Sequence, residues 1–319
     1  MARKKTHQEL IRGWHPFPEE ACQRYVAKAL WHNLTVLDLL DRNAEAFPNK
    51  LAIVDEKTEV TWRELQQRAN RLAIHLNRLG VGYGDFFVLD LVNTVEYAYF
   101  YFGLNRLGAI PVMCLPRHRR AEVEHQIRLH EAKGIVVPVG EKFDYVGMID
   151  EIRAQLPTLG ILLTVGGEAP HGWKSIEGLM EEEVEKEYGL DSLEQHRPNP
   201  NDICIGQLSG GTTGLPKGIP KTHNEYICQW EYLGRAAGHT DESVALIVIP
   251  ALHNAAFSLC LGPSVFRGGT VVLCKTASAE KQFEMIERYR VTHTMLIPIQ
   301  ITYWMKAEKQ MKHYDLSSL

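Results

Sequence analysis

The sequence predicts an α/β protein built from layered subdomains with largely parallel sheets, and three observations support this fold class. Apolar runs with strand character alternate with helical patterns along almost the whole chain, as expected for strands joined by crossover helices. The length of 319 residues is too great for one ordinary core and suits about two subdomains. Apolar residues make up 45% and charged residues 23%, which is close to the globular average and excludes disordered and fibrous classes.

The first clear helix is predicted to begin at Thr61. The stretch from Thr61 to Glu64 reads as a capping box, in which the threonine hydroxyl and the glutamate carboxylate satisfy free backbone N–H groups. Apolar residues then recur at helical spacing from Leu65 to Leu79, and Gly80 follows as a stop signal. The alternation continues through the first half of the chain. Strands are expected at 86–92, 109–115, 134–139 and 160–165, and helices at 95–107, 121–130 and 145–156.

A polar segment at 189–202, which holds Pro198 and Pro200, is the predicted internal boundary. It is interpreted as a linker between a first α/β subdomain at 1–188 and a second at 203–319. The strongly acidic stretch 180–187 is interpreted as a solvated helix face, because charge runs usually face water. Beyond the boundary, strands are expected at 203–208, 244–249, 270–274 and 292–297, and helices at 223–237, 255–266 and 279–289.

The overall charge and the cysteine pattern limit the classes of partner and compartment. A formal net charge of −4 provides no global basic field for nucleic acid or an anionic membrane. No stretch approaches the roughly 20 apolar residues that span a bilayer, and no apolar segment follows the charged N-terminus. Six cysteines without a C-x-x-C pair are expected to be reduced thiols, and the histidines show no metal-ligand spacing. We therefore expect a cytoplasmic protein without a nucleic-acid or membrane partner.

The segment from Leu208 to Gly218 carries the strongest chemical signal. It follows a predicted strand and reads Leu-Ser-Gly-Gly-Thr-Thr-Gly-Leu-Pro-Lys-Gly. Glycines let the backbone turn sharply and approach a ligand, hydroxyls add donors beside exposed N–H groups, and Lys217 supplies a mobile positive charge. These features suit a polyphosphate. The residues concerned are Ser209, Gly210, Gly211, Thr212, Thr213, Gly214 and Lys217.

Two familiar nucleotide loops and one structural alternative compete with this interpretation. A Walker loop requires Gly-Lys followed by Ser or Thr, but here Pro216 precedes Lys217 and Gly218 follows it. The dinucleotide pattern Gly-x-Gly-x-x-Gly fails because Gly210 and Gly211 are adjacent. The structural alternative is a surface turn rich in glycine and threonine, which is disfavoured because the whole segment suits phosphate binding.

This segment resembles the phosphate-binding signature of the adenylate-forming superfamily, which includes acyl-CoA synthetases, luciferases and the adenylation domains of peptide synthetases. Residues 60–65 and 106–112 resemble two earlier conserved blocks of that superfamily. Further blocks are similar to aryl-acid adenylating enzymes, such as the 2,3-dihydroxybenzoate–AMP and salicylate–AMP ligases of siderophore biosynthesis. These blocks are 13–19, 115–119, 208–211, 219–223 and 250–254. The resemblance covers nearly the whole chain and implies the N-terminal domain of such an enzyme.

The resemblance implies a reaction in two half-steps. A carboxylate attacks the α-phosphate of ATP to give an acyl-adenylate and pyrophosphate, and a thiol then displaces AMP. The resemblance assigns residues 209–214 and Lys217 to the β- and γ-phosphates of ATP, and it implies Mg²⁺ held by a later block of the family. The thiol belongs to an aryl-carrier protein, or to CoA if the protein is an aryl- or acyl-CoA ligase. A non-catalytic AMP-binding fragment is a further alternative.

The resemblance also places an aryl-acid pocket at His253 and Asn254, which follow the predicted strand 244–249. That position is a carboxyl end, where α/β sheets bind ligands. Asn254 is expected to contact the carboxylate or a neighbouring ring hydroxyl, although asparagine also suits the N-cap of the following helix. Phe257 and Ser258 are expected to line the same pocket. Lys217 and His253 are the candidate catalytic residues.

Two departures from the family pattern bear on these expectations. The dihydroxybenzoate enzymes have an aromatic residue after the asparagine and a polar residue further along, whereas this chain continues from Ala255 to Leu259 as Ala-Ala-Phe-Ser-Leu. A more apolar and differently shaped pocket is therefore expected, and 2,3-dihydroxybenzoate, salicylate, benzoate and other aryl acids stay open. The later blocks of the family, which complete the nucleotide and metal sites and supply a catalytic lysine, do not occur before Leu319. These residues alone are therefore expected not to complete adenylation. His223 is interpreted as a structural residue that packs the loop onto its helix.

Overall fold

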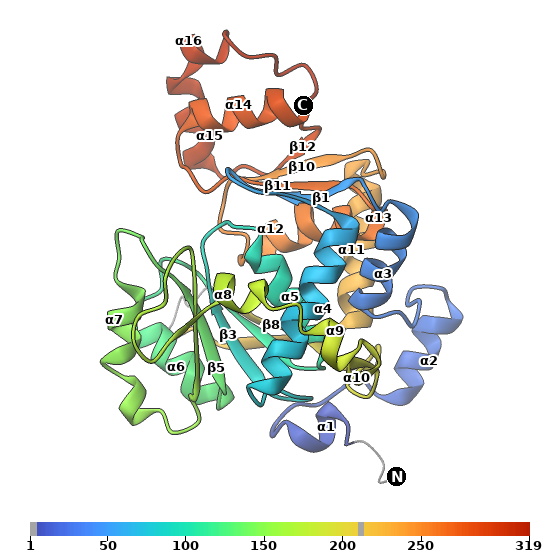
Figure 1. Ribbon diagram of the computed structural model, residues 1–319. Coiled ribbons are helices and arrows are strands. Elements are labelled where there is room, and N and C mark those ends of the chain that lie inside the picture. The colour runs from blue at the N-terminus through green and yellow to red at the C-terminus, as the bar shows by residue number, and fades with distance from the viewer. Residues whose placement is uncertain (1–4, 210–213) are drawn as a thin grey trace. The chain divides into compact units, whose positions relative to one another are not determined.

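The computed structural model describes residues 5–209 and 214–319 (Figure 1). The chain divides into two compact units, each of which draws on segments that are distant in the sequence. Unit 1 comprises Met1–Asp38, Gln67–Leu91 and Tyr99–Cys228, and unit 2 comprises Leu39–Gln66, Val92–Ala98 and Gln229–Leu319.

This division differs from the predicted boundary at 189–202. β8 (Ile203–Leu208) belongs to unit 1 because it pairs with β4 (Ile110–Cys114) in one sheet. β1 (Leu51–Val54) belongs to unit 2 because it pairs with β11 (Thr270–Leu273). The prediction treated each subdomain as one continuous stretch of chain, whereas strand pairing joins stretches that lie far apart in the sequence.

The sheet of unit 1 has seven strands in the order β7-β6-β5-β3-β4-β8-β9. Every neighbouring pair is parallel except β8 and β9, which are antiparallel. The predicted strands at 86–92, 109–115, 134–139, 160–165 and 203–208 are thereby confirmed, most of them with slightly shorter ends. The other strands of this sheet are β3 (Phe86–Asp90), β5 (Gly134–Pro138), β6 (Ile161–Val165), β7 (Lys174–Ser175) and β9 (Gly218–Thr222).

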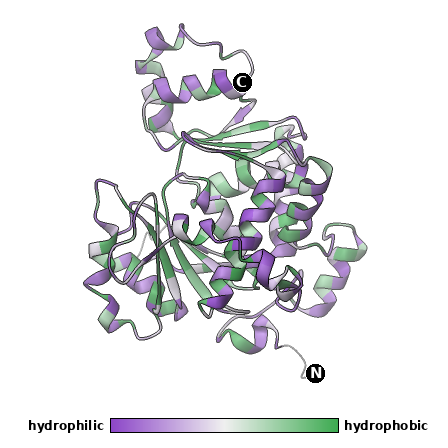
Figure 2. Ribbon diagram, viewed as in Figure 1, coloured by the Kyte–Doolittle hydropathy of each residue, from purple (hydrophilic) through white to green (hydrophobic). Residues whose placement is uncertain are grey.

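The central strands of this sheet are buried on both faces, as parallel strands between crossover helices are. Every residue of β4 and of β5 is buried, and Figure 2 shows the strands mainly in the hydrophobic colour. On one face the core includes Val123 and Ile127 of α6 (Arg120–His130) and Ile149 of α7 (Tyr145–Asp150). This packing gives a rigid base to the segments that leave the carboxyl ends of the strands.

The sheet of unit 2 has five strands in the order β12-β10-β11-β1-β2. All neighbours are parallel except β1 and β2 (Glu59–Thr61). β10 (Val244–Ile247) and β11 confirm two predicted strands, but the strand predicted at 292–297 is reduced to β12 (His293–Thr294). Leu246, Val272 and Phe283 belong to the core of this unit.

The helices follow the predicted alternation, with additions that the apolar pattern did not reveal. Unit 1 also holds α1 (His7–Leu10), α2 (Glu19–Ala27), a 3₁₀ turn (Arg153–Gln155), α8 (Ile176–Glu181), α9 (Glu185–Tyr188) and α10 (Asp191–Glu194). The residues of α3 (Val36–Ala46), α4 (Trp62–Arg78), α5 (Glu96–Arg106) and α11 (His223–Ala237) are shared between the units. Unit 2 also holds α12 (Asn254–Ala256), a π-helix (Phe257–Leu261), α13 (Gly262–Arg267), α14 (Ala279–Tyr289), α15 (Pro298–Lys306) and α16 (Glu308–Met311).

The capping box predicted at Thr61 is confirmed at the start of α4. The Thr61 N–H donates to Oε2 of Glu64 at 2.8 Å, and the Glu64 N–H donates to Oγ1 of Thr61 at 3.3 Å. Two backbone donors that have no partner inside the helix are thus satisfied reciprocally. The cap sets the residue at which α4 begins.

Replacing Thr61 with alanine is expected to lower the free energy of unfolding by about 1 kcal/mol, because the Glu64 N–H loses its capping acceptor. Thr61→Ser keeps the hydroxyl and is expected to stay within about 0.5 kcal/mol of the parent. Urea unfolding of the three proteins measures both changes. Equal stability of the alanine and serine variants would show that the cap contributes nothing.

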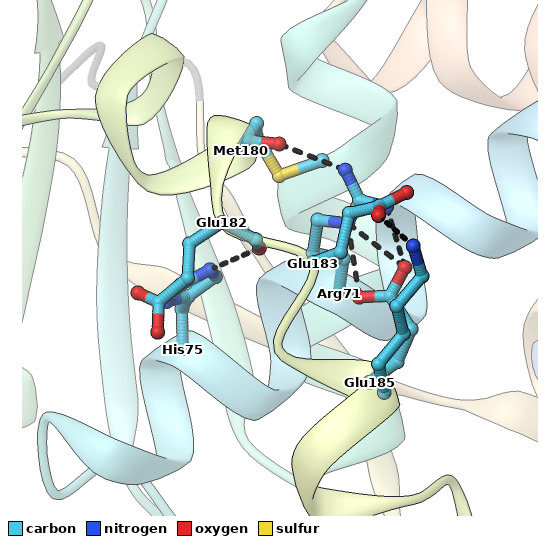
Figure 3. A network of polar contacts seen from close by, with 7 residues as sticks. Arg71, His75, Met180, Glu182, Glu183 and Glu185 are labelled. Atoms are coloured by element: carbon cyan, nitrogen blue, oxygen red, sulfur yellow. Dashed lines mark hydrogen bonds and ion pairs between the residues drawn. The ribbon is translucent and has the colours of Figure 1, made fainter.

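The acidic stretch 180–187 is tied to α4 as well as exposed to water (Figure 3). The Arg71 guanidinium forms an ion pair with Glu185 at 2.5 Å and donates to the Met180 carbonyl at 2.8 Å. Nε2 of His75 lies 3.3 Å from the Glu182 carbonyl oxygen. The interpretation as a solvated helix face therefore needs correction at Glu185, which is only 25% exposed and whose charge is paired because α4 presents Arg71 beside it.

The described part of the chain contains no helix that is both long and apolar enough to cross a bilayer. All six cysteines are free thiols, and Cys228 alone among them is partly exposed while the other five are buried. Buried thiols of this kind behave as small apolar core residues.

Candidate functional site

The predicted phosphate-binding segment, residues 208–218, is closed at its base by two hydrogen bonds between its ends. The Ser209 N–H donates to the Lys217 carbonyl at 3.0 Å, and the Lys217 N–H donates to the Ser209 hydroxyl oxygen at 2.9 Å. The segment therefore leaves the carboxyl end of β8, turns back and enters β9. The predicted site residues Gly210, Gly211, Thr212 and Thr213 lie outside the described residues.

The described part of the loop has a backbone that requires glycine and presents a lysine to solvent. Gly214 has a φ of +150°, which residues with a side chain rarely adopt. The Lys217 side chain is exposed, whereas Pro216 beside it is buried. The geometry thus fixes the backbone at Lys217 and leaves its ammonium group accessible to a ligand.

Two side chains of helix α6 contact the segment, and neither was predicted from the sequence to belong to the site. Nε2 of Gln126 donates to the Pro216 carbonyl at 2.5 Å. The His130 ring lies against Gly218, where an added Cβ would come within 2.5 Å of Nε2. Burial lowers the pKa of His130, so the ring is neutral at physiological pH. The spacing of four residues on one helix face is the signal that could have paired Gln126 with His130.

His223 is structural, as predicted, but its partner was not foreseen. It is fully buried at the start of α11, and its Nδ1 accepts a hydrogen bond from the Val36 N–H at 3.2 Å. Burial lowers the pKa of His223 to about 3, with a further contribution from nearby His7. The neutral ring therefore anchors the first turn of α3 through Val36.

The predicted acid-binding pair lies in unit 2, after β10 and at the start of α12. His253 is the N-cap of this helix, with Nδ1 accepting from the Ala255 N–H at 3.1 Å. The predicted capping role thus belongs to His253 and not to Asn254. Oδ1 of Asn254 accepts a hydrogen bond from the Ser258 hydroxyl at 3.1 Å. Both His253 and Asn254 are exposed, while Ser258 is buried.

A π-helix at Phe257–Leu261 interrupts the helix that was predicted at 255–266. Such wide turns are rare and occur frequently at functional sites. The Phe257 side chain is fully buried and packs against Tyr97 and Trp230, with ring centroids 6.3 Å and 5.6 Å away. Phe257 is therefore part of the core behind the predicted acid-binding residues.

Asn93 is a residue of this region that the sequence reasoning missed. Its Nδ2 donates to the carbonyls of Ile249 at 2.9 Å and Cys274 at 3.0 Å, and its Oδ1 accepts from the Ala251 N–H at 2.7 Å. These bonds hold together the segments that follow β10 and β11. A polar residue soon after a buried strand was the available signal, since β3 ends at Asp90.

The structure thus gathers the predicted site residues into two sets, one in each unit. Ser209, Gly214 and Lys217 form the first set, and His253, Asn254, Phe257 and Ser258 form the second. Among the residues that are described, no group of three or more His, Cys, Asp or Glu side chains is arranged to hold a metal ion.

Comparisons with known proteins identify the family and the fold. Residues 40–319 match the family model described as AMP-binding enzyme. The vibriobactin-specific 2,3-dihydroxybenzoate-AMP ligase of Vibrio cholerae is 36% identical over 95% of this chain and 55% of its own length. A salicylyl-CoA synthase / salicylate adenylyltransferase of a Streptomyces species is 32% identical over 94% of this chain and 55% of its own length.

The fold is also found in a solved structure. The apo structure of Mycobacterium smegmatis MbtA superposes with a TM-score of 0.84 and 30% identity, over 95% of this chain and 55% of that one. This match confirms the predicted α/β class with largely parallel sheets. The chain spans about half the length of the relatives it matches. On the family match and these similarities, the chain belongs to the AMP-binding enzyme family.

Proposed function

We propose that this chain supplies the phosphate loop and the acid-binding residues of a ligase that activates an aryl carboxylic acid with ATP. The products of that step are an acyl-adenylate and pyrophosphate. The observation that carries the proposal is the closed loop after β8, whose base bonds join Ser209 and Lys217 and leave the lysine side chain exposed. Family membership supports the use of ATP.

Within this proposal the loop binds the triphosphate electrostatically. The Lys217 ammonium contacts the β- and γ-phosphates and offsets the charge that develops on the leaving pyrophosphate. The Ser209 oxygen accepts from the Lys217 N–H, so its own proton can be donated to a phosphate oxygen. The loop thereby holds the triphosphate, one of the two anions that must be brought together. Orienting it against the carboxylate accounts for much of the rate of adenylation.

The acid-binding residues have hydrogen-bonding preferences set by their neighbours. Ser258 donates to Oδ1 of Asn254, so the Nδ2 end of this amide is the one suited to a carboxylate. Nδ1 of His253 accepts from a backbone N–H, which places the proton of the neutral ring on Nε2. Both residues therefore offer donors to an anionic substrate, in line with the catalytic role proposed for His253.

The acid and its acceptor follow from the resemblance and are proposed as classes. The alanines after Asn254 favour an apolar pocket, and the two named relatives act on 2,3-dihydroxybenzoate and salicylate. We propose an aryl acid of this size, used in siderophore biosynthesis, and an aryl-carrier protein as the thiol acceptor. CoA is the second candidate acceptor, because the Streptomyces relative is named as a CoA synthase.

Mg²⁺ is expected from the resemblance, but the described residues offer no cluster that fits it, so no step is assigned to it.

The test is pyrophosphate exchange into ATP that depends on an aryl acid, measured on the complete product of the gene and on this chain. A panel of 2,3-dihydroxybenzoate, salicylate, benzoate and aliphatic acids identifies the class of substrate. Thioester formation with CoA or with a carrier protein then separates the two acceptors. A complete product that exchanges with no carboxylic acid would refute the proposal and favour a non-catalytic AMP-binding protein.

Lys217→Ala is expected to lower this exchange roughly 10–100-fold, because a hydrogen bond to a charged group contributes about 1.5–3 kcal/mol. Lys142→Ala is the matched control, since Lys142 is also an exposed lysine of unit 1. Its exchange rate is expected to equal that of the parent. Unchanged exchange in Lys217→Ala would remove this residue from the phosphate site.

A further inference from the structure

We propose that Gln126 is a positioning residue for the phosphate loop, and that it holds the Pro216 backbone so that Lys217 is presented to a polyphosphate. The proposal rests on the proposed function of the loop. It adds a residue from α6, far from the loop in sequence, to the machinery that binds the triphosphate.

The first support is the chemistry of Gln126 itself. Its side chain is fully buried, and its Nε2 donates to the Pro216 carbonyl at 2.5 Å. Its Oε1 has no hydrogen-bond partner among the described residues. A buried amide with an unused acceptor costs roughly 1–3 kcal/mol, so an apolar side chain would stabilise the fold better at this position. The contact with Pro216 is the gain that offsets this cost.

The second support is that α6 touches the loop on both sides of Lys217. Gln126 holds Pro216, the residue before the lysine, and one turn later His130 packs against Gly218, the residue after it. The His130 ring is itself oriented by a bond from Nδ1 to the Gln126 carbonyl at 2.9 Å. The two side chains therefore act on the loop from one helix face.

The third support is that the Lys217 backbone is also constrained by Ser209, the residue that follows β8. The Lys217 N–H donates to the Ser209 hydroxyl oxygen, and the Lys217 carbonyl accepts from the Ser209 N–H. The backbone of Lys217 is thus held by Ser209 across the loop, and its two neighbours are held by α6. The exposed side chain is then the mobile part of the residue. A backbone ordered before binding lowers the entropy that a ligand must otherwise overcome.

Loss of the Gln126 contact is therefore expected to weaken polyphosphate binding without unfolding the protein. Gln126→Met keeps the length of the side chain, removes the bond to Pro216 and also removes the unpaired amide oxygen. The stability lost with the hydrogen bond to Pro216 is offset by removal of the unpaired amide oxygen, so the midpoint of thermal unfolding should change little. Affinity for inorganic tripolyphosphate should fall about 10-fold, because the loop must then be ordered on binding.

The experiment measures the binding of inorganic tripolyphosphate to this chain by titration calorimetry. The variants are Gln126→Met, Lys217→Ala and the control Gln155→Met, which alters an exposed glutamine of the same unit. Gln126→Met and Lys217→Ala should weaken binding, whereas Gln155→Met should bind as the parent does. Gln126→Leu, which also removes the buried amide and its bond to Pro216, replaces the methionine variant if that protein does not fold.

A second measurement separates this proposal from the proposed function. Amide hydrogen exchange at Lys217 and Gly218 should accelerate in Gln126→Met and not in Gln155→Met, with no ligand present. Unchanged exchange, or normal tripolyphosphate affinity in Gln126→Met beside weak binding in Lys217→Ala, would overturn the role of Gln126 alone. Equal affinity of the parent and Lys217→Ala would instead refute the phosphate function of the loop, and the positioning role would fall with it.

Discussion

Asp90→Val is expected to raise the free energy of unfolding by about 2–3 kcal/mol at pH 8, because Asp90 is a buried carboxyl whose oxygens are not bound. The residue ends β3, faces Cys114 in the neighbouring strand and is 0% exposed. Neither of its oxygens has a hydrogen-bond partner among the described residues. Valine has a similar volume and suits a strand, so it removes the unsatisfied group without leaving a large cavity.

The size of this gain is expected to depend on pH. Burial raises the pKa of Asp90 well above its usual value, and a weaker opposing effect comes from Arg119. Between the unfolded and folded pKa values, the folded protein holds a proton that the unfolded chain has released. Stability of the parent therefore falls as pH rises through that window, by up to about 1.4 kcal/mol per pH unit.

The measurement is urea unfolding of the parent and of Asp90→Val at pH 4, 6 and 8. The difference between them should be smallest at pH 4 and grow with pH. The free energy of unfolding of Asp90→Asn should depend less on pH than that of the parent, because asparagine cannot ionise. Its stability should stay below that of Asp90→Val, because asparagine keeps an unpaired polar group. A valine variant that is less stable than the parent at pH 8 would show that the Asp90 carboxylate is ionised and bound.

Asn93→Ala is expected to lower the free energy of unfolding by about 3–5 kcal/mol, because three hydrogen bonds in a buried place are lost together. The side chain of Asn93 is 6% exposed, and alanine leaves the Ala251 N–H and the Ile249 and Cys274 carbonyls without it. The change also releases the segment that leads to His253, so the aryl-acid binding that we propose for this region should weaken in parallel.

Urea unfolding and hydrogen exchange at the Ala251 amide measure this effect at two scales. The Ala251 amide should exchange faster in Asn93→Ala, since it loses the acceptor that protects it. Asn199→Ala is the control, because Asn199 is exposed and its substitution should stay within about 0.5 kcal/mol. A loss below 1 kcal/mol in Asn93→Ala would mean that water replaces the side chain in this network.

The features that depend on residues close together in the chain could be predicted from the sequence. The capping box at Thr61 acts within one helical turn, so its residues alone specify it. The strand–helix alternation follows from burial on both faces of a parallel sheet, which leaves apolar runs such as 134–138. The stretch 208–218 predicts a phosphate-binding loop, because glycines, hydroxyls and a lysine follow one another there. These features, and the family resemblance that rests on them, could be predicted without the structure.

Non-local pairing was decided only by the tertiary structure. The membership of β1 and β8 in their sheets depends on hydrogen bonds to strands far along the chain, and no periodicity within either segment encodes the partner. Gln126 and Asn93 are buried polar residues, and their roles arise from carbonyls that folding brings to them. The π-helix at Phe257–Leu261 likewise depends on the packing of Phe257 in the core. Contacts between distant residues cost chain entropy and form only when the whole core is assembled, so one sequence read locally does not reveal them.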